Sequence, residues 1–90
     1  MSKERWYAFS KREQLLFIGS EFERARVSQL EGKQEYLQSA LERALALIDL
    51  SLGDPKWSKE RYRLWVLRDA VAEYYAGKDG SDIGMLYAVL

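Results

Sequence analysis

Glycine and proline divide this chain into three segments of nearly equal length. Gly32, Gly53 and Gly77 each follow a stretch of about 20 residues rich in helix-forming residues, and Asp54-Pro55 comes directly after Gly53. Glycine favours the left-handed conformation that often follows the last turn of a helix, and proline favours the first helical position. The pattern therefore predicts three long helices, near residues 11–31, 33–52 and 55–76.

Each predicted helix carries apolar residues at the spacing of one helix face. Ser10 and Glu13 have the spacing of a capping box, which marks the start of the first helix. A short turn around Gly32 joins the first two helices, so we expect them to pack antiparallel. The predicted fold class is all-α: an antiparallel three-helix bundle with a short C-terminal helix, in a single domain of residues 1–90.

The two ends of the chain are also rich in apolar residues. Trp6, Tyr7 and Phe9 precede the first predicted helix, and we expect them to form an aromatic N-terminal arm. A turn-forming sequence follows Gly77, and Ser81 stands where an N-cap would be. We therefore expect the short C-terminal helix to cover residues 82–90, with its apolar side chains packed across the bundle or against a further part of the chain.

The composition argues against most kinds of catalysis. The chain has no Cys and no His, so it lacks the thiolate nucleophile, the usual general base and the commonest metal ligand. The glycines after residue 76 do not have the spacing of a phosphate-binding loop. We expect a protein that is not an enzyme and that has no cofactor, no metal site and no small-molecule ligand.

Charge and hydropathy limit the partners that the sequence predicts. Lys plus Arg and Asp plus Glu number 14 each, so the formal net charge is zero. Duplex DNA and anionic membranes attract basic proteins, which makes both poor candidates here. The most apolar stretch, residues 40–52, contains Glu42, Arg43 and Asp49 and is too polar to cross a bilayer. No apolar signal-like run follows the first charged residues, so we expect a cytoplasmic protein without membrane contact.

The third predicted helix has apolar residues on two sides. Tyr62, Trp65 and Val66 lie away from its main stripe, and Phe17 lies away from the stripe of the first helix. In a three-helix bundle these four side chains should stay exposed, and exposed apolar patches with Tyr and Trp are typical of interaction surfaces. The leading hypothesis is a protein that acts through protein–protein interaction, with a second copy of itself in a homodimer or with another protein.

Two alternatives remain open. The run from Lys56 to Trp65 alternates basic and aromatic residues, as in modules that stack nucleic-acid bases and neutralise phosphates. Arg26 and Arg68 lie in or beside predicted apolar arcs, and a buried guanidinium needs an anionic or carbonyl partner. The two arginines are therefore expected to form buried ion pairs or, under a third hypothesis, an anion-binding or catalytic site; the ion pairs are favoured.

Overall fold

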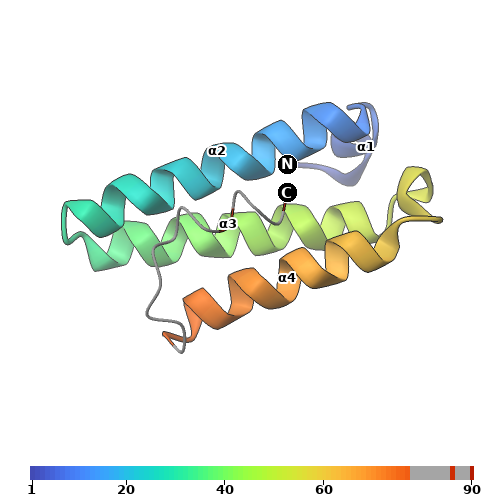
Figure 1. Ribbon diagram of the computed structural model, residues 1–90. Helices are drawn as coiled ribbons and strands as arrows, with labels where there is room; N and C mark the ends of the chain where they lie inside the picture. The colour runs from blue at the N-terminus through green and yellow to red at the C-terminus, as the bar shows by residue number, and fades with distance from the viewer. Residues whose placement is uncertain (78–85, 87–89) are drawn as a thin grey trace.

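Three long helices and one short helix make up the fold in the computed structural model, which describes residues 1–77, 86 and 90 (Figure 1). They are α1 (Lys3–Tyr7), α2 (Lys11–Leu30), α3 (Gln34–Leu52) and α4 (Arg61–Tyr75), with a 3₁₀ turn over Pro55–Trp57 between α3 and α4. The described residues contain no strand, and the predicted all-α fold class is confirmed. The predicted helix over 82–90 falls almost entirely on residues outside the described ones.

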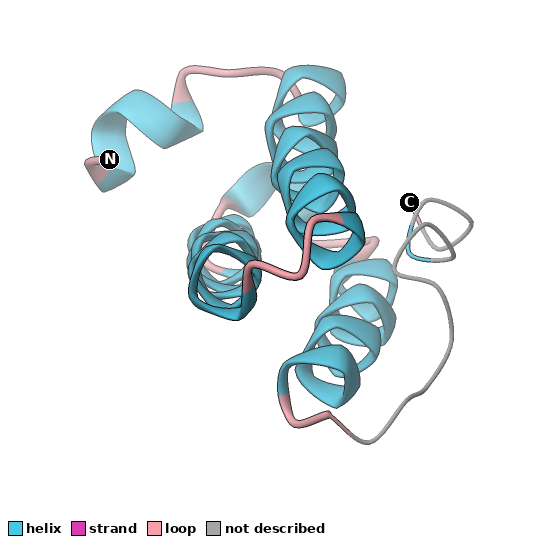
Figure 2. Cartoon of the chain, turned by 90° about the vertical axis from the view of Figure 1, so that its left-hand side faces the viewer, coloured by secondary structure: helices cyan, strands magenta, loops and turns pink. Residues whose placement is uncertain are grey.

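Helix α3 lies between α2 and α4 and packs against both (Figure 1). The view along the helices in Figure 2 shows the three long helices at the corners of a triangle rather than in one layer. Successive long helices run in opposite directions, as the turn at Gly32 and the short connection after Gly53 require. The predicted antiparallel three-helix bundle is thus confirmed, with α1 packed against α3 as an additional element.

The core is formed by the inward faces of all these helices. It includes residues from the predicted stripes of each long helix, together with Trp6 from α1 and Leu86 near the end of the chain. Its fully buried side chains with the largest volumes are Trp6, Trp57, Phe22, Ile18, Leu41, Ile48, Leu64, Leu67, Leu86, Gln14 and Val71. Leu90 packs against this core, and its carbonyl oxygen accepts a hydrogen bond from Arg63 Nη2 at 3.3 Å. At least these two C-terminal leucines therefore pack across the bundle.

Glycine marks the helix ends in two different ways. Gly32 and Gly77 have φ angles of 69° and 71°, the left-handed conformation expected after a helix. Gly53 has a φ of −84°, so the predicted left-handed cap is wrong at this position. A Cβ atom at Gly53 would lie 2.8 Å from the Tyr7 hydroxyl oxygen. Glycine at position 53 thus leaves room for the Tyr7 hydroxyl, and its backbone conformation does not require glycine.

The third predicted helix is wrong over residues 55–60. Asp54 is an N-cap as expected, because its Oδ1 accepts a hydrogen bond from Lys56 N at 3.0 Å, but the turn that follows is 3₁₀ and ends at Trp57. This turn carries the Trp57 side chain inward to α2. Helix α4 begins only at Arg61, whose Nε donates to the carbonyl oxygen of Leu52 at 3.0 Å and ties the start of α4 to the end of α3.

A buried hydrogen-bond cluster of Trp6, Gln14, Ser51, Asp54 and Trp57, here called the Gln14 cluster, joins four segments of the chain. The Gln14 amide donates to the Trp6 carbonyl oxygen at 3.0 Å and to Asp54 Oδ2 at 2.9 Å, and its oxygen accepts from Trp57 Nε1 at 2.6 Å. Trp6 Nε1 donates to Ser51 Oγ at 2.9 Å. An indole N–H can only donate, and a carboxylate or carbonyl can only accept, so these partners fix the orientation of the amide.

Because Trp6 belongs to the Gln14 cluster, the predicted aromatic arm of Trp6, Tyr7 and Phe9 packs against the bundle, and part of it forms helix α1. Trp6 is completely buried, and its ring lies 6.0 Å from that of Phe9 and 5.8 Å from that of Phe17, centroid to centroid. An exposed hydrogen bond also holds this segment, since Lys56 Nζ donates to the Tyr7 carbonyl oxygen at 2.6 Å. Residues 1–9 are therefore part of the domain and not an appendage.

We expect Gln14→Ala to lower the free energy of unfolding by about 3 kcal/mol, since it leaves buried partners such as the Trp57 indole N–H unsatisfied. Urea titration followed by circular dichroism measures the effect. Gln38→Ala is the matched control, because Gln38 is exposed on α3 and alanine is a good helix former. Equal stability of the two variants would contradict the structural role of the cluster.

We also expect stability to fall in acid through Asp54. Burial by itself would raise the pKa of Asp54, but hydrogen bonds from the Lys56 N–H, the Gln14 amide and the Lys56 ammonium, with the charge of Lys56, outweigh burial and lower that pKa. The folded pKa thus lies below the unfolded value of about 3.9. The ionised carboxylate stabilises the fold above that value, and the contribution is lost as the pH falls through the folded pKa.

Urea titrations at several acidic pH values measure this dependence. Asp54→Asn should lower stability near neutral pH and flatten the acid limb of the profile. Part of the slope should persist through Glu13, whose pKa is lowered by its backbone and side-chain hydrogen bonds with Ser10. If Asp54→Asn loses as much stability between neutral and acidic pH as the wild type does, Asp54 does not contribute to the acid dependence.

Candidate functional site

The outer side of α4 carries three of the four residues predicted for an interaction surface. Tyr62, Trp65 and Val66 are 67%, 52% and 57% exposed, whereas Leu64 and Leu67 of the same helix are almost fully buried. Their spacing of three and four residues places them next to one another on one helix face. We call Tyr62, Trp65 and Val66, with the exposed acidic residues Asp69 and Glu73 that continue the same face, the α4 face.

Phe17 lies on a different helix from the other three residues. It belongs to α2, and α3 runs between α2 and α4 (Figure 1). The Phe17 ring is 40% exposed and packs against Phe9, with 4.8 Å between the ring centroids, and against Trp6. The structure thus assigns Phe17 to the surface around α1 and α2, not to the α4 face.

Arg26 and Arg68 form ion pairs with carboxylates on separate parts of the bundle. Arg26 Nη2 lies 2.6 Å from Glu23 Oε1 on α2, and Arg68 Nε lies 2.7 Å from Asp49 Oδ1 on α3. Both arginine side chains are about one-third exposed. The hydrogen bond and the charge of Asp49 raise the pKa of Arg68. The two arginines are thus held at half-buried ion pairs on different helices, and the structure does not bring them together in one site.

The basic and aromatic run from Lys56 to Trp65 does not form one continuous surface. Trp57 is buried, with its indole nitrogen bound to Gln14, so its ring is not available for stacking. Arg61 donates to the Leu52 carbonyl oxygen, and Arg63 contacts Glu60 and the Leu90 carbonyl oxygen. Several of the cations in this run are therefore engaged within the protein.

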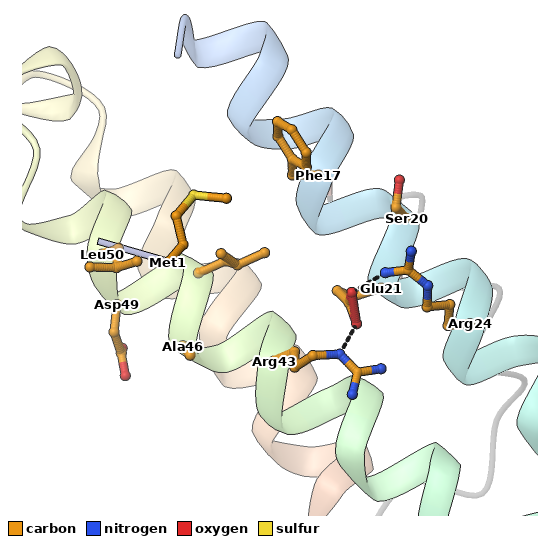
Figure 3. A pocket seen from close by; sticks show the side chains of 10 residues that line it. Met1, Phe17, Ser20, Glu21, Arg24, Arg43, Ala46, Asp49 and Leu50 are labelled. Atoms are coloured by element: carbon orange, nitrogen blue, oxygen red, sulfur yellow. Dashed lines mark hydrogen bonds and ion pairs between the residues drawn. The ribbon is translucent and has the colours of Figure 1, made fainter. Parts of the chain in front are cut away.

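A groove of about 850 Å³ lies between the outer sides of α2 and α3 (Figure 3). One end is lined by apolar side chains, among them Phe17 and Leu50, and Met1 reaches into it from the N-terminus. Its full lining is Met1, Phe17, Ser20, Glu21, Arg24, Arg43, Ala46, Leu47, Asp49 and Leu50. We call this the α2/α3 groove.

The other end of the α2/α3 groove is built around a buried carboxylate. The side chain of Glu21 is only 7% exposed and lies between two guanidiniums, as the dashed contacts in Figure 3 show. Its Oε1 accepts from Arg24 Nη1, and its Oε2 accepts from Arg43 Nε at 2.7 Å. Arg24 and Arg43 are themselves 63% and 52% exposed. Two cations and one anion give this end a net positive charge.

A second, smaller hollow continues along the same two helices. It is lined by Val27 and Ser28 of α2 and by Tyr36 and Ser39 of α3, and it shares Arg24 and Arg43 with the α2/α3 groove. Glu23 also lines this hollow, and its carboxylate is paired with Arg26. Val27 and Tyr36 are among the exposed large apolar residues of the protein. The two arginines thus stand between two apolar stretches of the α2–α3 surface.

The predicted site residues did not include Glu21, Gln14 or the α2/α3 groove. A signal was present in the sequence, because Gln14 and Glu21 have helical spacing from Ile18 and Phe22 and so fall on the buried stripe of α2. A polar residue on such a stripe indicates a buried partner, but not which partner.

Comparisons with protein families, curated proteins and solved structures found no match to this chain. None of the described helices combines the length and the hydrophobicity of a membrane-spanning segment. The same residues contain no group of three or more acidic side chains placed to hold a metal ion.

Proposed function

We propose that this chain is a small, non-enzymatic interaction protein that self-associates through the α4 face, with the cytoplasm as its expected compartment. The proposal rests on one observation: Tyr62, Trp65 and Val66 are contiguous, more than half exposed, and carried by a helix whose opposite side is anchored in the core. Apolar side chains gathered in this way are typical of interaction sites, and Tyr and Trp are frequent among the residues that dominate binding energy.

The energetics of the α4 face favour association but also limit it. Burial of one medium-sized apolar side chain stabilises a complex by about 1.5–3 kcal/mol. Association of two proteins costs about 4–15 kcal/mol in lost translational and rotational freedom. Three side chains therefore cannot supply a tight complex by themselves, and further contacts with the partner are needed.

Trp65→Ala should weaken self-association by about tenfold or more without unfolding the bundle, because Trp65 is half exposed in the single chain. Sedimentation equilibrium across the micromolar range measures the association, and thermal melting checks the fold. Leu30→Ala is the matched control, since Leu30 is 74% exposed at the end of α2, away from the α4 face. A wild-type chain that stays monomeric throughout this range would refute the proposal, and a Trp65→Ala variant that unfolds would show that Trp65 belongs to the core.

The nucleic-acid hypothesis has a weaker basis, because Trp57 is buried and several of the nearby cations have partners within the protein. Titration of labelled single-stranded RNA and DNA separates the two hypotheses. We expect no saturable binding at moderate salt. Binding that falls steeply with salt and is lost in Trp65→Ala would favour the nucleic-acid module instead.

A further inference from the structure

We propose that the surface which receives the α4 face of a second copy is the α2/α3 groove. This inference rests on the proposed function, since it requires self-association through α4, and it adds the site at which the neighbouring α4 binds. The occupant is thus a defined helix of this same chain, and the two surfaces match in spacing and in charge.

The α4 face and the α2/α3 groove have the same two-part order. The α4 face is apolar in its N-terminal half, at Tyr62, Trp65 and Val66, and acidic in its C-terminal half, at Asp69 and Glu73. The groove is mainly apolar at the end with Phe17, Leu47 and Leu50, where the Asp49 carboxylate is already paired with Arg68. It is cationic at the end with Arg24 and Arg43. Apolar surface can therefore meet apolar surface while carboxylates meet guanidiniums.

The spacing along the helices also agrees. Phe17 and Arg24 are seven positions apart on α2, as are Tyr62 and Asp69, and Val66 and Glu73, on α4. At 1.5 Å per residue each of these intervals is about 10 Å. A docked α4 that runs parallel to α2 would thus place its apolar and acidic halves opposite the matching ends of the groove.

The arginines retain capacity for a second carboxylate. Glu21 occupies one nitrogen of each guanidinium, Nη1 of Arg24 and Nε of Arg43, and each guanidinium carries five N–H donors. Both side chains are more than half exposed, so an incoming carboxylate can reach them without displacing Glu21. Glu21 holds the two cations at the groove, and Asp69 and Glu73 of the neighbouring copy supply the complementary charge.

This contact joins two different surfaces of the same protein. A dimer made by two α4 faces would be self-complementary and would close at two copies. A contact between the α4 face and the α2/α3 groove leaves one α4 face and one groove unused at the two ends of the assembly. Further copies can therefore add to form chains, or the two ends can meet and close a ring. The two modes of association therefore predict different behaviour when single surfaces are blocked.

Two variants block the two surfaces separately. Ala46→Trp fills the α2/α3 groove at an exposed position and leaves the α4 face intact, and Val66→Asp blocks the α4 face and leaves the groove intact. Each variant alone should remain monomeric, and an equimolar mixture should form a complex of twice the mass of one chain. Gln38→Trp, an exposed substitution elsewhere on α3, is the control and should associate like the wild type. Thermal melting establishes that all the variants are folded.

Sedimentation and native mass spectrometry separate failure of this inference from failure of the proposed function. If Ala46→Trp associates like the wild type while Val66→Asp is monomeric, two α4 faces pair with each other and the groove is not the receiving surface. If Val66→Asp associates like the wild type, self-association through α4 itself is refuted. Association should also weaken at about 1 M salt, where the screening length is about 3 Å; strengthening there would contradict pairing with Arg24 and Arg43.

Discussion

The Gln14 side chain holds together parts of the chain that lie far apart in the sequence. Its amide binds the Trp6 carbonyl, the Asp54 carboxylate and the Trp57 indole, and Trp6 in turn binds Ser51. A buried polar group without a partner is costly, so each member of the cluster depends on the presence of the others. The docking of α1 and the inward turn of Trp57 follow from this arrangement, whereas the start of α4 is held separately by the hydrogen bond from Arg61 to the Leu52 carbonyl oxygen.

Packing around this cluster determines which surfaces remain for binding. The core uses the inner sides of α2, α3 and α4, and the C-terminal leucines described by the structure add to it. The α4 face stays outside because Leu64, Leu67 and Val71 already fill the core side of that helix. Between α2 and α3, the buried carboxylate of Glu21 holds two arginines at the edge of the α2/α3 groove. An apolar surface and a cationic surface thus arise from the same packing.

Much of the fold was predictable from local signals, because helix ends depend on neighbouring residues. Ser10 and Glu13 form the predicted capping box, and Gly32 adopts the predicted left-handed conformation. The break between Trp57 and Arg61 was not predictable, since it depends on contacts with Gln14 and Leu52 from other segments. The burial of Trp6 escaped prediction for the same reason: its partner Ser51 lies 45 residues away. For the candidate site, periodicity placed Tyr62, Trp65 and Val66 outside the core, but it could not show that Phe17 belongs to another surface.

The sequence by itself determined the three long helices apart from the start of α4, their antiparallel order and the surplus of apolar residues on α4, because these depend on composition and on spacing along one helix. Only the tertiary structure decided which polar residues are buried together and which surfaces face solvent. Gln14 and Glu21 occupy similar positions on one helical stripe, yet Gln14 became the centre of a closed hydrogen-bond cluster and Glu21 the base of an open groove. The difference comes from what packs opposite each of them, and hydrogen bonds between distant segments have no local signature in a sequence.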